Sequence, residues 1–137
     1  MSDSSTSGKP LPTVIWIDDD LNSTRLWVSI LERYVGVKVV GTAPDSTVGR
    51  HLIEELNPDL IFLDHMMPGI AGIDAIHYIR EVAPQTKLIF RSYRFPDPVI
   101  VQQALEAGAD RVISYGPLRV DEMRVIVQEV LKGVSPS

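Results

Sequence analysis

The sequence predicts an α/β fold: a doubly wound, five-stranded parallel sheet with helices on both faces. Three observations support this prediction, namely five short apolar runs, five intervening segments with helical periodicity, and no repeat at the sequence level. Runs that are apolar continuously, rather than alternately, are typical of strands covered on both faces, and parallel sheets are built from such strands. Because crossovers between parallel strands are right-handed, alternating strands and helices produce a doubly wound sheet.

The five expected strands are short and rich in β-branched and aromatic residues. In chain order they are residues 14–17, 37–40, 60–63, 88–90 and 112–113. The first run stops at three consecutive aspartates, residues 18–20, and the third run stops at Asp64. Two strands of the predicted sheet therefore end in acidic residues.

Five helices are expected between and after these strands. Asn22 or Ser23 is expected to cap the first helix, and Asp45 or Ser46 the second. The third should stop before Pro84, and Gly108 and Gly133 should end the fourth and fifth. The residues expected to face the core are Leu26, Ile30 and Leu31 in the first helix, Val48, Leu52, Ile53 and Leu56 in the second, Ile73, Ile76, Ile79 and Val82 in the third, Val101, Ala104 and Leu105 in the fourth, and Val120, Met123, Val127, Val130 and Leu131 in the fifth.

Length and composition exclude several classes of protein. The 137 residues are 45% hydrophobic, which suits one domain with its own core. A net charge of −5 disfavours sequence-independent binding to nucleic acid. The absence of cysteine excludes disulfides and thiolate sites, and no apolar run approaches the roughly 20 residues of a membrane span. The expectation is a cytoplasmic domain, preceded by a disordered tail at residues 1–11.

The acidic strand ends point to a metal site. In open α/β sheets, ligands bind beyond the carboxyl ends of the strands. If the first and third strands are neighbours, Asp18, Asp19 and Asp64 converge, and two unit charges about 4 Å apart repel by roughly 4 kcal/mol at an effective dielectric of 20. Either some of these carboxylates stay protonated or a divalent cation neutralises them, and an all-oxygen cluster favours Mg²⁺. Asp20 is interpreted as a loop residue or helix cap, and Ser92, after the fourth strand, as a hydroxyl that could reach a metal-bound anion.

Three segments in the expected order resemble the receiver domain of two-component response regulators. They are residues 15–20, 58–69 and 104–110, and the resemblance extends over residues 13–132. It implies the flavodoxin-like strand order 2-1-3-4-5, a receiver domain at residues 12–133, and a C-terminal tail or linker start at residues 134–137.

The resemblance also implies roles for individual residues. Asp64 would accept a phosphoryl group, Asp19 would ligate Mg²⁺ directly and Asp18 through water, the Met66 carbonyl would complete the protein ligands, and Ser92 would be the switch hydroxyl. The implied partners are a histidine kinase or phosphotransfer protein, a downstream effector, and a second copy bound through the fourth helix, fifth strand and fifth helix. No nucleic-acid or membrane partner is expected, and no catalysis beyond self-directed phosphotransfer and autodephosphorylation.

The sequence departs from the receiver pattern at two switch positions. Tyr115 stands where the family places a lysine after the fifth strand, and Val112 stands where it places an aromatic switch residue. Arg91 and Arg94 flank Ser92, and Arg94 is the candidate surrogate cation, against the alternative that it is a solvated surface arginine. Tyr115 could instead close over the site with its ring or donate its hydroxyl.

Two other functions compete with a phosphorylated receiver. The two departures favour a degenerate receiver that acts as a phosphorylation-independent interaction module. A haloacid-dehalogenase-like phosphatase would use Asp18 as nucleophile and Asp20 as acid, but the chain lacks that family's spacing and inserted length.

Overall fold

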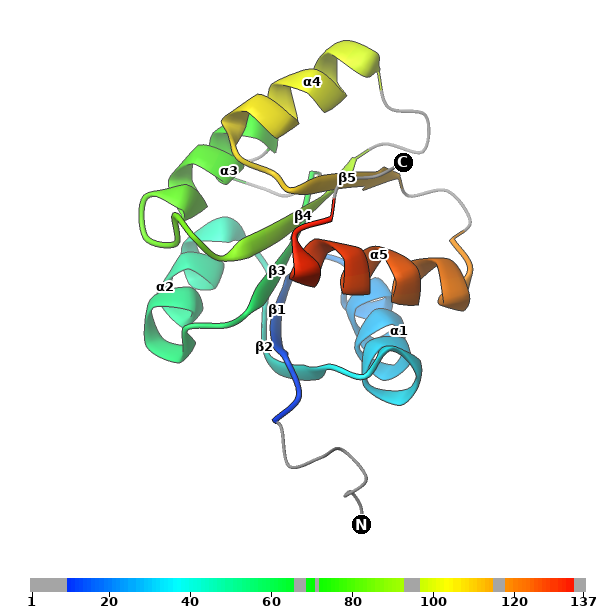
Figure 1. Ribbon diagram of the computed structural model, residues 1–137. Coiled ribbons are helices and arrows are strands. Elements are labelled where there is room, and N and C mark those ends of the chain that lie inside the picture. Colours follow the sequence, from blue (N-terminus) through cyan, green and yellow to red (C-terminus); the bar gives the residue numbers. More distant parts are fainter. Residues whose placement is uncertain (1–9, 66–68, 71, 93–96, 115–117, 135–137) are drawn as a thin grey trace.

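Five parallel strands form one sheet in the order β2-β1-β3-β4-β5 (Figure 1). This is a computed structural model, and it describes residues 10–65, 69–70, 72–92, 97–114 and 118–134. The strands are β1 (Thr13–Ile17), β2 (Lys38–Ala43), β3 (Leu60–Asp64), β4 (Lys87–Ser92) and β5 (Arg111–Ser114). The fold class and strand order predicted from the sequence are confirmed, while the predicted tail at residues 1–11 lies mostly outside the described residues.

Helices cover both faces of the sheet. Two of them, α1 (Leu21–Ile30) and α5 (Val120–Lys132), lie on one face in Figure 1. The other face carries α2 (Ser46–Leu56), α3 (Gly72–Arg80) and α4 (Pro98–Ala107). A π-helical turn, η1 (Leu31–Val35), continues α1 and ends at Gly36, whose φ of 83° suits glycine. No helix in the described part of the chain has the length and apolarity needed to cross a bilayer.

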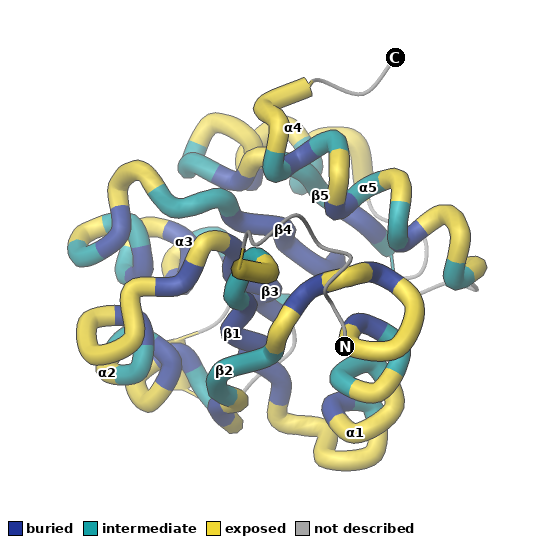
Figure 2. The backbone as a smooth tube through the Cα atoms, turned by 60° about the horizontal axis from the view of Figure 1, so that its bottom comes forward, coloured by how far each residue is buried: buried dark blue, intermediate teal, exposed yellow. Residues whose placement is uncertain are grey.

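The sheet separates two hydrophobic cores, and the strands are its most deeply buried part (Figure 2). Side chains of a strand alternate between faces, so Ile15 and Ile17 pack towards α2 and α3, while Val14 and Trp16 pack towards α1 and α5. Both faces being covered explains why the runs are apolar without alternation.

The helix caps differ in part from the prediction. Asp20, rather than Asn22 or Ser23, caps α1, because its side chain accepts hydrogen bonds from the backbone N–H groups of those two residues. The interpretation of Asp20 as a cap is therefore confirmed. Asp45 caps α2, as expected, by accepting from the N–H of Val48.

Some residues expected in the core are exposed. Leu26 is 57% exposed, whereas Thr24 on α1 is buried. The face of α1 that meets the sheet is thus rotated from the predicted stripe, and the Thr24 hydroxyl is satisfied by the Asp20 carbonyl at 2.9 Å. The prediction that Leu105 of α4 faces the core is also wrong, because this side chain is exposed. In α2 the expected residues Val48 and Leu56 are exposed, and α3 ends at Arg80, before the half-buried Val82.

Candidate functional site

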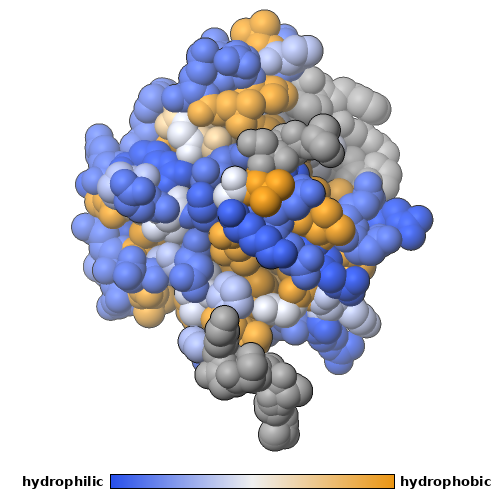
Figure 3. All heavy atoms as spheres, in the orientation of Figure 1, coloured by the Kyte–Doolittle hydropathy of each residue, from blue (hydrophilic) through white to orange (hydrophobic). Residues whose placement is uncertain are grey.

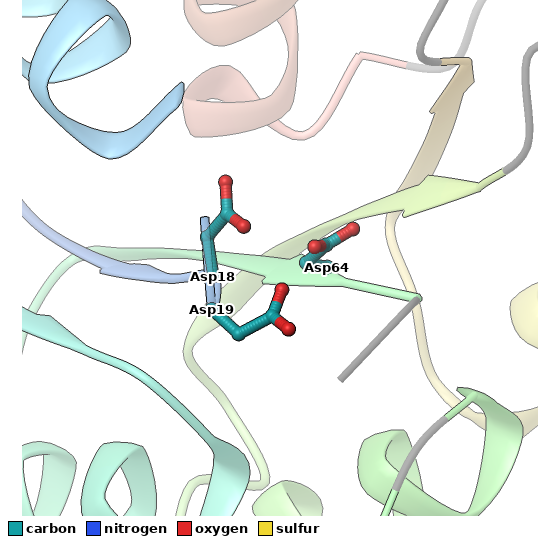
Figure 4. A group of neighbouring side chains, drawn as sticks. All are labelled: Asp18, Asp19 and Asp64. Carbon is teal, nitrogen blue, oxygen red and sulfur yellow. The ribbon is translucent and has the colours of Figure 1, made fainter. Parts of the chain in front are cut away.

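Three carboxylates meet at the carboxyl edge of the sheet. Strands β1 and β3 are hydrogen-bonded neighbours, so Asp18, which follows β1, comes beside Asp64, which ends β3. Asp19 extends from the same turn towards Asp64 (Figure 4). One oxygen from each of the three carboxylates lies within 4.8 Å of the others. The structure therefore brings together the acidic residues that the sequence analysis singled out.

The three carboxylates differ in burial. Asp18 and Asp64 are buried, at 5% and 4% exposed, whereas Asp19 is exposed. In the described chain, no side chain or backbone N–H donates a hydrogen bond to the Asp19 carboxylate. Asp18 and Asp19 border a recess of about 190 Å³, which is also lined by Leu21, Thr42 and Pro44 among others. Asp19 thus lies at the mouth of the pocket, with its oxygens accessible to an incoming ion.

Asp18 is held in one orientation by hydrogen bonds from three residues. Its Oδ1 accepts from the backbone N–H of Asp20 at 2.9 Å, and its Oδ2 accepts from Trp16 Nε1 at 3.3 Å and from an Arg91 nitrogen at 3.1 Å. Burial raises the pKa of Asp18, but the Asp20 N–H, the Asp64 side chain, the Arg91 charge and the Trp16 indole together hold this pKa below its ordinary value. The carboxylate is therefore kept ionised inside the protein.

Arg91 is a site residue whose role the sequence analysis missed. It lies opposite Asp64 in the pairing of β3 with β4 and is 8% exposed. Its guanidinium carbon lies 4.9 Å from the centroid of the Trp16 ring. The ion pair with Asp18 is buried, with 10% of the Arg91 side chain and 2% of the Asp18 side chain exposed. A buried cation thus lies against the Asp18 carboxylate.

The sequence contained a signal for this contact. Side chains of a strand alternate, so Arg91 faces the same side as Ile89, which packs in the core that contains Trp16. An arginine at the end of an otherwise apolar buried strand needs a charged partner, and the nearest carboxylates on that face end β1 and β3. Finding Arg91 required the strand order.

Ser92, the last residue of β4, carries a buried hydroxyl next to Arg91 in the chain. Its Oγ is fully buried, and it has no hydrogen-bond partner among the residues that the structure describes. Buried hydroxyl groups are rarely left unpaired without a functional reason.

Val112, beside Phe90 in the pairing of β4 with β5, is half-buried and packs against the core on the α2, α3 and α4 face.

The donor set fits a hard divalent cation. Three carboxylates provide oxygen ligands alone, which suits Mg²⁺ rather than a softer transition metal. Asp19 is accessible for direct ligation, and Asp18, with both oxygens engaged by the protein, is suited to contact through water.

The profile of the response regulator receiver domain matches residues 14–128, most of the chain. The chain belongs to the response regulator receiver domain family. The curated relatives it matches include two enzymes named protein-glutamate methylesterase/protein-glutamine glutaminase 2. One, from Bordetella avium (strain 197N), is 30% identical over 90% of this chain and 38% of its own length. The other, from Cupriavidus pinatubonensis (strain JMP 134 / LMG 1197), is 35% identical over 70% of this chain and 27% of its own length.

Solved structures agree with this family. The response regulator domain of Thermotoga maritima CheB superposes with a TM-score of 0.79 at 27% identity, covering 92% of this receiver and 99% of that chain. The receiver spans about a third of the length of the two methylesterase relatives, so it corresponds to one part of those longer proteins.

Three predicted site residues of this receiver lie outside the described residues. They are Met66, the expected carbonyl ligand, Arg94, the candidate surrogate cation, and Tyr115, at the position of the family lysine. Two histidines in this part of the chain have different surroundings. His65 packs edge-on against Phe90 with ring centroids 5.5 Å apart, and burial lowers its pKa. His77 is exposed on α3.

Proposed function

We propose that this receiver accepts a phosphoryl group on Asp64 from a histidine kinase or phosphotransfer protein in a Mg²⁺-dependent reaction. The observation that carries the proposal is the convergence of Asp18, Asp19 and Asp64 within 4.8 Å at the carboxyl edge of the sheet. The proposal assigns residues 12–133 to the receiver, with the phospho-donor and the reaction in the cytoplasm. Residues 134–137 are proposed as a tail or the start of a linker.

The chemistry proposed for the pocket is a single transfer. An oxygen of Asp64 attacks the phosphorus of the phosphohistidine, the P–O bond forms as the P–N bond breaks, and the leaving imidazole nitrogen keeps the electron pair and takes up a proton. Asp19 and Asp64, with the Met66 carbonyl, would hold Mg²⁺, and Asp18 would contact it through water. Bound there, Mg²⁺ supplies charge neutralisation for the phosphoryl oxygens.

The signal is proposed to be a conformational switch of an atypical kind. The product adds about −1.5 to −2 charges next to the buried Ser92 hydroxyl, which could then donate to a phosphoryl oxygen. Val112 offers no ring to rotate inward, so another group must report the change. The output face is proposed to be α4, β5 and α5, for an effector or a second copy. Hydrophobic atoms lie over α4 in Figure 3, and Val99 and Leu105 on this helix are exposed.

Intact-mass measurement tests the proposal. The protein is incubated with Mg²⁺ and acetyl phosphate, and the wild type should gain about 80 Da, one phosphoryl group. Asp64→Asn should gain nothing, and Asp74→Asn, an exposed aspartate in the first turn of α3, should behave as the wild type. No adduct on the wild type, with Mg²⁺ still altering tryptophan emission, would favour the degenerate receiver that acts as an interaction module. Continued release of phosphate that depends on Asp18 would favour a phosphatase.

A further inference from the structure

The buried ion pair between Arg91 and Asp18 is the basis of an inference that rests on the proposed function. We propose that Arg91 supplies the positive charge of this acid pocket and acts by that charge on the ion and on the transferred phosphoryl group. In this role the guanidinium weakens Mg²⁺ binding and accelerates phosphoryl uptake. The charge thus comes from inside β4 rather than from the segment after β5, where Tyr115 replaces the family lysine.

The geometry holds Arg91 rigidly at the pocket. Its guanidinium is bound on one side by Asp18 Oδ2 at 3.1 Å and covered on another by the ring of Trp16. Its backbone is fixed next to the acceptor strand, because the N–H of His65 donates to the Arg91 carbonyl at 2.8 Å. Arg91 and Asp64 are also directly paired between β3 and β4. A side chain placed by strand pairing and stacking is held more firmly than one on a loop.

The charges in the pocket explain why a cation belongs there. Three carboxylates lie within 4.8 Å of one another, and in the described chain Arg91 is the one Lys or Arg that forms an ion pair with any of them. Arg111, on the neighbouring strand, is paired with Glu129 instead. Lys87 lies at the opposite end of β4. Arg91 therefore leaves the pocket less negative than its carboxylates alone would make it.

Removing this charge should change Mg²⁺ binding and phosphoryl uptake in opposite directions. A pocket without the guanidinium is more negative, so it attracts Mg²⁺ more strongly, but it also repels the phospho-donor and stabilises the transferred group less well. A purely structural arginine would behave differently, because its loss would loosen Asp18 and impair both steps.

The test compares three variants with the wild type. Arg91→Gln removes the charge, Arg91→Lys keeps it, and Arg111→Gln removes a partly buried, paired arginine from the adjacent strand. Mg²⁺ affinity is measured by isothermal titration calorimetry, and uptake from acetyl phosphate by intact mass at saturating Mg²⁺. Arg91→Gln should bind Mg²⁺ about tenfold more tightly and take up phosphoryl about tenfold more slowly. Arg91→Lys should lie within about threefold of the wild type in both measurements, and Arg111→Gln should match the wild type.

The inference is overturned if Arg91→Gln weakens Mg²⁺ binding or changes neither quantity. A wild type that binds no Mg²⁺ and forms no adduct overturns the proposed function itself, which is a different result. If Arg91→Gln does not fold because Asp18 is left charged and buried, Asp18→Asn is compared with Asp18→Asn/Arg91→Gln. The double variant should again bind Mg²⁺ about tenfold more tightly than the single one, and equal affinities would overturn the inference.

Discussion

Two arginine-containing clusters lie near opposite ends of the sheet, and their donors and acceptors are matched to different degrees. At the amino end, Arg80 donates to the carbonyls of Ala83, at 2.8 Å, Thr86 and Gly108, and pairs with Asp110 at 3.1 Å. The Asp110 carboxylate in turn accepts from the N–H of Leu88. This network connects the end of α3 to the segments that lead into β4 and β5.

The carboxyl end is arranged differently. There the guanidinium of Arg91 pairs with Asp18, which is one of three clustered carboxylates. Asp19 has no donor in the described chain, and the buried Ser92 hydroxyl has no partner among the described residues. A polar cluster with matched donors and acceptors stabilises the fold, whereas a cluster with surplus negative charge has capacity for a ligand. The Arg80 cluster is therefore suited to holding the fold together, and the acid pocket is suited to binding a ligand.

The largest effect is expected for Arg80→Met, which should lower stability without changing Mg²⁺ binding. Three carbonyls and Asp110 would lose their donor, so the free energy of unfolding should fall by about 3 kcal/mol and the Tm by roughly 10 °C. Mg²⁺ affinity should stay at the wild-type value. Thermal unfolding and calorimetry measure the two effects, with Arg25→Met, an exposed arginine on α1, as the control. A loss of Mg²⁺ affinity in the folded Arg80 variant would contradict the separation of the two ends.

The opposite result is expected for Asp19→Asn, which should lower Mg²⁺ affinity without changing stability. This carboxylate is exposed and accepts no hydrogen bond within the described chain, so stability should hold while Mg²⁺ affinity falls by roughly thirtyfold, about 2 kcal/mol. Calorimetry checks the affinity. Asp20→Asn is the matched control, because asparagine caps a helix as well as aspartate and Mg²⁺ affinity should change by less than about threefold. Equal losses in the two variants would indicate nonspecific attraction to acidic residues rather than a site.

Mg²⁺ itself should stabilise the fold through the acid pocket alone. At ten times its Kd, an ion that binds only the native state adds about 1.4 kcal/mol to the free energy of unfolding. Urea unfolding with Mg²⁺, compared with K⁺ at equal ionic strength, measures the gain. The gain should persist in Arg80→Met and disappear in Asp19→Asn, and the reverse pattern would place the ion elsewhere.

The smallest expected effect distinguishes two buried serines. Ser92→Ala removes a hydroxyl without a partner in the described chain, so the free energy of unfolding should change by no more than about 0.5 kcal/mol. Ser46→Ala should cost about 1 kcal/mol or more, because this buried hydroxyl donates to the Ile70 carbonyl at 2.8 Å. Urea unfolding of both variants gives the difference. A large loss for Ser92→Ala would mean that this hydroxyl is structural.

Local signals in the sequence were sufficient for the architecture. Continuous apolar runs predicted strands covered on both faces, and Gly108 and Gly133 ended helices as expected. The acidic residues after β1 and β3 could be assigned to one edge because parallel strands bring their carboxyl ends together. These features depend on residues that are close together in the sequence, so the sequence is enough to predict them.

The helix faces could be read only in part. Leu31, at the start of η1, is buried as expected, but in α1 the expected Leu26 is exposed and Thr24 is buried. A hydroxyl satisfied within its own helix can be buried at little cost, so hydrophobicity alone did not determine the rotation of the helix.

Tertiary structure alone decided the partner of Arg91. The sequence places this arginine 73 positions from Asp18, and no local pattern connects them. Only the order β1-β3-β4, together with the alternation of side chains along each strand, puts the guanidinium on Trp16 and against the carboxylate. The sequence thus determined which charged residues lie at the ends of the strands. The packing of the sheet determined which of these residues meet, because the distance between two side chains on different strands depends on the order of the strands.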